Sequence, residues 1–136
     1  YNNNLYKNWR GFVFDSNPYY WIDKGNPMTA NIRLNDVNEK IINLIYAING
    51  EFTPSSKYRY FYLFKQDWLP EDFVSKIEKI YCFDNFSEEK FHERFGVYNQ
   101  ILDECIERCD ELNLLPENIE DYYSENFSRF NDNNLE

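Results

Sequence analysis

Few residues in this sequence carry the nitrogen or sulfur donors that bind zinc and other transition metals. The chain has one histidine, His92, and three cysteines, Cys82, Cys105 and Cys109. Glu89 and His92 have the Glu-x-x-His spacing of helices that bind two iron ions, but that site needs a second such pair, which one histidine cannot supply. Zinc sites use Cys-x-x-Cys pairs or several histidines, whereas Cys105 and Cys109 are four residues apart. We therefore expect no metal and no cofactor.

The patterns that accompany nucleophilic and nucleotide chemistry are also missing. Cys109 or Ser128 could in principle meet His92 in space, but no nucleophile-elbow or papain-like signature flanks any serine or cysteine. The four glycines are scattered, which excludes a phosphate-binding loop and a dinucleotide fingerprint. Among 24 acidic residues, a pair of carboxylates at working distance for acid–base chemistry is expected by chance. The sequence favours binding over catalysis.

The acidic residues are distributed unevenly along the chain. Residues 1–66 hold eight Lys and Arg against five Asp and Glu, a balance of +3, and residues 67–136 hold six against nineteen, a balance of −13. Nucleic acid and anionic membranes bind through Lys and Arg, so this charge disfavours both as partners. It favours a basic protein partner, because opposed charges accelerate association and reject wrong partners.

One helix should present much of this charge. From Ser87 to Leu115, apolar residues recur at steps of four and three, the spacing of one helical stripe; they are Phe91, Phe95, Tyr98, Leu102, Cys105, Cys109 and Leu112. Acidic residues fill the positions between them and continue beyond the helix. The predicted partner-binding residues are Asp103, Glu104, Glu107, Asp110, Glu111, Glu117, Glu120 and Asp121. The alternative is that this face only keeps the protein dissolved.

The elements before this helix divide into strands and helices. Residues 9–15, 19–22 and 28–34 read as three short strands joined by turns that contain Gly, Asn and Pro. Residues 57–65, KYRYFYLFK, alternate with a period of two and read as a fourth strand. The rings of residues 19–21 and Trp68 are expected mainly in the core, although a sheet covered on one side would expose some of them as interface anchors.

Helices are expected in three further places. Asp36 and Glu39 have the spacing of a capping box ahead of a helix that stops at Gly50. A second helix should start at Pro70, and a last one should follow Pro116 over residues 119–130. The fold class predicted is α+β: a small antiparallel sheet, the N-terminal meander plus strand 57–65, covered by helices, with a mainly helical acidic C-terminal half. Residues 1–136 form one domain, with flexible ends at 1–8 and 131–136.

Composition also suggests where the protein works. An odd number of cysteines, two of them on an apolar stripe, indicates reduced core residues in a cytoplasmic protein. The longest apolar runs, such as 41–48, are too short and too polar to cross a bilayer, and the sequence opens on polar residues instead of an apolar signal segment.

In size, acidity and aromatic content the chain resembles immunity proteins of bacterial toxin systems, although no motif carries that likeness. The uneven charge predicts a small cytoplasmic inhibitor, an immunity protein or antitoxin that neutralises a basic toxin, a nuclease above all, by covering its basic active-site cleft with carboxylates. Two alternatives stay open: a phage or plasmid nucleic-acid mimic that blocks a restriction or CRISPR effector, and an enzyme with a carboxylate or metal-dependent acidic cleft. A concave pocket of convergent carboxylates would favour the enzyme, and a flat or convex acidic face would favour an inhibitor.

Overall fold

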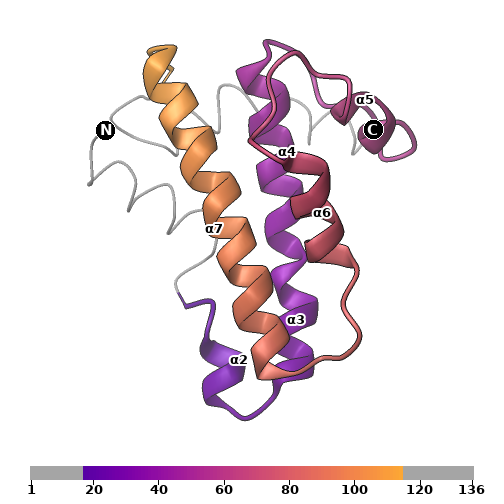
Figure 1. The fold of residues 1–136 in the computed structure, drawn as a ribbon, viewed down its shortest axis with the longest axis vertical. Coiled ribbons are helices and arrows are strands. Elements are labelled where there is room, and N and C mark those ends of the chain that lie inside the picture. The colour runs from indigo at the N-terminus through magenta and orange to yellow at the C-terminus, as the bar shows by residue number, and fades with distance from the viewer. Residues whose placement is uncertain (1–16, 115–136) are drawn as a thin grey trace, which may run out of the picture.

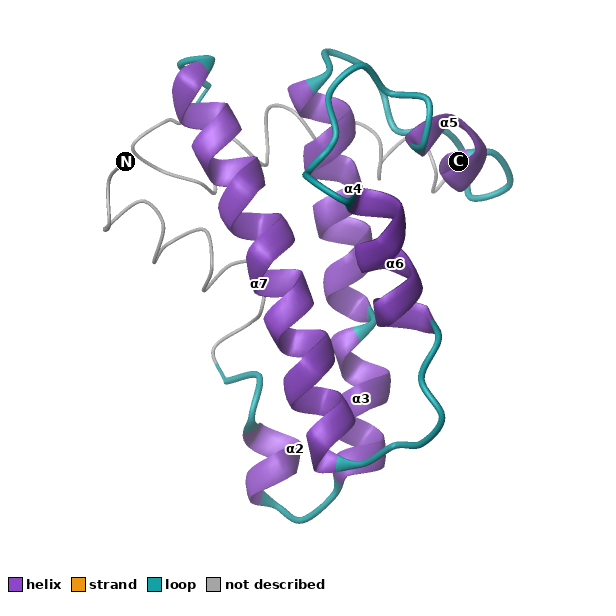
Figure 2. Ribbon diagram, in the orientation of Figure 1, coloured by secondary structure: helices purple, strands orange, loops and turns teal. Residues whose placement is uncertain are grey.

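The computed structural model describes residues 17–114, and every regular element in this range is a helix (Figure 2). The helices are α2 (Tyr20–Asp23), α3 (Pro27–Leu34), α4 (Asp36–Ile48), α5 (Arg59–Leu63), α6 (Phe73–Tyr81) and α7 (Glu88–Glu111). The long helix α7 packs against α3, α4 and α6, while α2 and α5 lie toward opposite ends of the molecule (Figure 1). The predicted α+β fold with an antiparallel sheet is therefore wrong for the described residues, because they contain no strand.

The predicted strand 28–34 is the helix α3. Asn26 caps its first turn by accepting a hydrogen bond from the Thr29 N–H at 3.0 Å, and Pro27 occupies the first helical position. The alternation of apolar residues was misleading because Met28 and Ile32 are exposed, whereas the polar Asn31 is buried. The buried positions recur at steps of three and four and continue into α4; they are Ala30, Asn31, Leu34, Val37, Asn38 and Ile41.

The other predicted strands within the described residues are helical too. Residues 19–22 contribute most of α2, and the centre of 57–65 forms the short helix α5, in which only Leu63 is buried. In α5 nearly every residue is apolar, so a period of two could not be told from a helical period. The predicted strand 9–15, the predicted helix 119–130 and both predicted flexible ends lie outside the described residues.

The helix after Asp36 is confirmed, but its predicted capping box is wrong. The residue that precedes α4 is Asn35, which has helical backbone angles and makes no side-chain capping bond. The chain stays nearly helical from α3 into α4, and the Asn38 N–H bonds the Asn35 carbonyl at 3.1 Å. Gly50, with φ of +70°, follows the end of the helix, as predicted.

The predicted helix after residue 70 starts three residues late. Asp72 precedes α6 in the left-handed region, with φ of 52°, so Pro70 and Glu71 belong to the loop between α5 and α6. Phe73, Ile77 and Ile80 form its buried face.

The long helix predicted from Ser87 to Leu115 is confirmed as α7. The Ser87 side chain accepts a hydrogen bond from the Lys90 N–H at 3.1 Å, as an N-cap does. Six of the seven predicted stripe residues are buried, and Leu112 lies beyond the helix and is exposed. Cys105 and Cys109 are buried free thiols, as predicted, but Cys82 follows the end of α6 and is exposed.

A buried arginine joins three of these helices. Arg94 on α7 is 1% exposed and donates to the Ile80 carbonyl at 2.8 Å, to the Asn31 carbonyl at 2.6 Å and to the Asn35 side chain. Its guanidinium also lies 4.2 Å from the centre of the Phe83 ring. The acceptors lie at the C-terminal ends of α3 and α6, where helix carbonyls lack partners, so Arg94 caps both helices from the inside.

Candidate functional site

The C-terminal half of α7 turns a row of carboxylates toward solvent. Asp103, Glu107, Asp110 and Glu111 are all exposed, and we call these four residues the acidic face. At 100° per residue they lie within an arc of about 100° and span about 12 Å along the helix. Four predicted binding residues are therefore brought together on one side of α7.

Glu104 is the exception among the predicted residues of α7. Its carboxylate lies 2.8 Å from the Lys76 ammonium on α6 and accepts a hydrogen bond from the Glu71 N–H at 3.1 Å. Both side chains of this ion pair are partly buried, so solvent screens the pair less than it would at the surface. Glu104 thus attaches α6 and the loop before it to α7, which makes it a structural residue as well as part of the candidate site.

Arg108 is the one cation among these carboxylates on α7. Its guanidinium lies 3.0 Å from the Glu111 carboxylate, and the Arg108 side chain is about one-third exposed. An exposed pair at this spacing contributes at most a few tenths of a kcal/mol. Arg108 thus relieves repulsion at Glu111.

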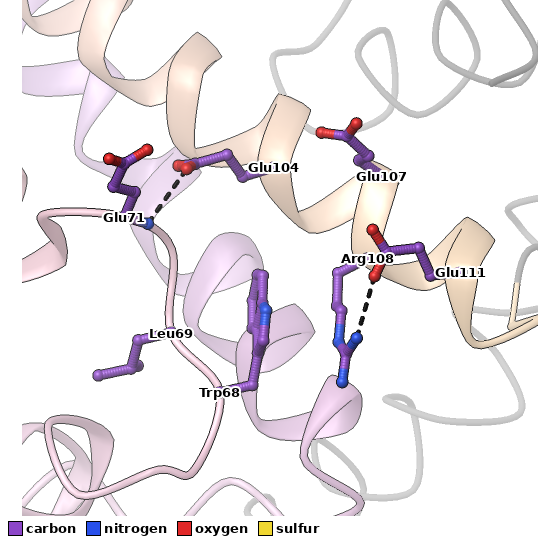
Figure 3. A pocket seen from close by; sticks show the side chains of 7 residues that line it. All are labelled: Trp68, Leu69, Glu71, Glu104, Glu107, Arg108 and Glu111. Carbon is purple, nitrogen blue, oxygen red and sulfur yellow. Dashed lines mark hydrogen bonds and ion pairs between the residues drawn. The ribbon is translucent and has the colours of Figure 1, made fainter.

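A pocket of about 310 Å³ lies between α7 and the loop that joins α5 to α6. Figure 3 shows Trp68 between Arg108 on one side and the hydrogen-bonded Glu71 and Glu104 on the other. The seven lining residues are Trp68, Leu69, Glu71, Glu104, Glu107, Arg108 and Glu111. An aromatic face beside several carboxylates suits the ammonium or guanidinium of an inserted Lys or Arg side chain.

The remaining sequence candidates for chemistry do not assemble within the described residues. Cys109 and His92 lie on the same helix, seventeen residues apart, so about 25 Å separates them. Burial also raises the pKa of Cys109 to about 12, which keeps its thiol protonated at neutral pH. His92 is exposed and lies 3.4 Å from Glu88, and no group of three or more potential metal ligands forms between residues 17 and 114.

Part of the predicted site lies outside the described residues, namely Glu117, Glu120, Asp121 and the candidate nucleophile Ser128. Of the aromatic residues expected in the core, Tyr19, Trp21 and Trp68 do pack against it, whereas Tyr20 is about half exposed.

The role of Lys76 and the placing of Trp68 beside α7 were missed in the sequence. Lys76 and Glu104 are 28 positions apart, and Trp68 is farther still from Arg108, so a single sequence offers no local signal for these contacts.

Within the described range, none of the helices combines the length and the apolar character that crossing a bilayer requires. The chain was also compared with known proteins, and no family model, curated protein or solved structure matches it.

Proposed function

We propose that this protein is a small acidic inhibitor, an immunity protein or antitoxin, which neutralises a basic bacterial toxin by covering its active-site cleft. The toxin class that best fits is a nuclease, because its substrate phosphates require a basic cleft. The observation that carries the proposal is the acidic face, which gathers exposed carboxylates on one side of α7 with Arg108 as the only nearby cation on that helix. Carboxylates so placed would occupy the phosphate positions of the cleft.

The neighbouring pocket would supply an anchor for this contact. A Lys or Arg side chain from the toxin would insert beside Trp68 and face Glu107, losing water as it does so. Desolvated pairs of this kind slow dissociation, whereas the charges at the rim of an interface mainly accelerate association. The proposal places the protein in the cytoplasm, and the free thiols of Cys82, Cys105 and Cys109 support this compartment.

The test uses the toxin candidate that gene order provides, the product of the gene immediately upstream. Cells that express that gene should grow only when they also express this protein. With the purified pair, Glu107→Lys together with Glu111→Lys should slow association about tenfold at low salt and flatten its salt dependence. Glu104 is left unchanged because it holds the loop onto α7.

A charge-matched control separates this effect from a general change in net charge. Asp23→Lys with Glu78→Lys alters the charge by the same amount at exposed positions outside the acidic face and the pocket. This control variant should associate about as fast as the wild type. Equal association rates and salt slopes for all three proteins would contradict the proposal.

The pocket is also the observation that favours the second candidate, an enzyme with an acidic cleft. Two of its glutamates already contact cations, Glu104 with Lys76 and Glu111 with Arg108. Glu71 and Glu107 would then act as the acid–base pair. An activity that is lost in Glu71→Gln and Glu107→Gln, while binding to the basic partner persists, would identify this function instead.

A further inference from the structure

The helix α5 exposes aromatic rings at one end of the molecule. Tyr58 is 47% exposed, Phe61 57% and Tyr62 46%, although side chains of this kind usually belong to cores or interfaces. Their rings contact one another, with centroids 6.1 Å apart for Tyr58 and Tyr62 and 5.1 Å apart for Phe61 and Tyr62. They therefore form one cluster instead of isolated exposed residues.

The same segment carries exposed cations. The Lys65 ammonium lies 3.8 Å from the centre of the Phe61 ring, and that of Lys57 lies 5.5 Å from the centre of the Tyr58 ring. Arg59 is left out of this set, because its guanidinium pairs with the Glu39 carboxylate at 2.7 Å. We call the three rings with Lys57 and Lys65 the basic tip; it joins exposed rings to two lysines on a chain whose net charge is −10.

We propose that the basic tip docks onto the acidic face of a second copy of this chain and forms a two-fold symmetric dimer. Figure 1 shows α5 and the C-terminal end of α7 at the same end of the molecule, on either side of the end of α4. In a two-fold dimer formed through this end, each tip would meet the acidic face of the other copy, so one contact is made twice. Lysines that meet carboxylates beside aromatic rings give complementary charge together with apolar area.

The area of the contact is sufficient for a weak dimer. Three rings about half exposed offer about 300 Å² on each tip, and each tip covers a similar area of the acidic face. Two such contacts bury about 1,200 Å² in total, the lower limit for specific interfaces. We therefore expect dissociation in the micromolar range, and weaker association at very low salt, where the net charges of the two copies repel each other.

This inference does not rest on the proposed function, because it uses only the two charged surfaces. It does bear on that function, since the dimer covers Glu107 and Glu111. A basic partner and the second copy would compete for the same carboxylates, and partner binding would dissociate the dimer.

The experiment is sedimentation equilibrium of the full chain at moderate salt with two charge-reversed variants. The tip variant carries Lys57→Glu and Lys65→Glu, and the face variant carries Glu107→Lys and Glu111→Lys. Each variant alone should show a dimer Kd raised by about tenfold or more, because each then places like charges at both contacts. Mixed in equal amounts, they should form a heterodimer, because both contacts again join opposite charges.

The control is the variant with Asp23→Lys and Glu78→Lys, whose dimer Kd should stay close to that of the wild type. Three results would overturn the proposal: a wild type that stays monomeric at millimolar concentration, variants that dimerise as the wild type does, or a mixture that fails to associate. A fourth is binding of labelled oligothymidylate by the wild type but not by the tip variant, because the tip would then be a stacking surface for single-stranded nucleic acid.

Discussion

Arg94 should be among the most sensitive positions of the fold, and Arg94→Met tests this directly. Methionine has a similar length and keeps the apolar contacts, but it removes every hydrogen bond that the guanidinium donates. The Ile80 and Asn31 carbonyls, now at 2.8 Å and 2.6 Å from Arg94, would remain buried without a partner. Each such group costs about 1–3 kcal/mol.

Removing the charge offsets part of this loss of stability, because a buried guanidinium is poorly solvated. Burial lowers the pKa of Arg94 for the same reason. We therefore expect a net loss of about 3–4 kcal/mol in the free energy of unfolding. That is a large part of the 5–15 kcal/mol typical of a domain, and it corresponds to a fall in Tm of about 10 °C or more.

Urea unfolding followed by circular dichroism measures the loss, and Arg108→Met provides the matched control. Arg108 lies on the same helix, but it is partly exposed and paired with Glu111 at the surface, so its loss should be below about 1 kcal/mol. Arg94→Lys should fall between the two variants, because one ammonium cannot reach all the acceptors of a planar guanidinium. A loss below about 1 kcal/mol in Arg94→Met would refute the interpretation that Arg94 caps two helices.

Three further predictions concern single groups. Glu107→Gln should stabilise the protein by about 0.5 kcal/mol, since Glu107 has like charges one turn away on both sides, and thermal unfolding should show a smaller gain at high salt. In a thiol titration, Cys82 should react in the folded protein, whereas Cys105 and Cys109 should react only after unfolding, because they are buried. Burial raises the pKa of Tyr98 above its usual value of 10.0, so the folded state keeps this proton more tightly than the unfolded chain. Stability should thus be unaffected below pH 10 and fall as the pH rises above it, with phenolate absorbance appearing together with unfolding.

The sequence predicted α7 correctly because its apolar period is regular over 24 residues and its start has a capping serine. It failed at α3 because two residues break the usual link between polarity and position. Asn31 is fully buried, where its amide donates to the Pro27 carbonyl at 2.9 Å and to the Ser87 carbonyl at 3.0 Å, while Ile32 faces solvent. The Pro27 carbonyl is a local partner within α3, but the Ser87 carbonyl comes close only in the tertiary structure, so no local pattern could show that Asn31 belongs to the core.

The candidate site was likewise predicted only in part from the sequence. The helical period alone placed Asp103, Glu107, Asp110 and Glu111 on one face of α7, as the structure has them. Glu104 instead pairs with Lys76, which lies on α6 and comes close to Glu104 only in the folded chain. The pocket beside Trp68 depends on the same packing of the loop against α7.

The two sides of α7 make opposite contributions to stability, and their sizes explain how the acidic face persists. Like-charge pairs one turn apart on the outer side destabilise the helix by about 0.2–0.5 kcal/mol each, or about 1 kcal/mol together. On the inner side, Phe91, Phe95 and Tyr98 are each nearly or fully buried, and a large apolar side chain contributes about 1.5–3 kcal/mol. The core therefore outweighs the repulsion several-fold, so the fold alone neither requires nor forbids these carboxylates. The proposed basic partner would gain this repulsion energy by neutralising the carboxylates on binding.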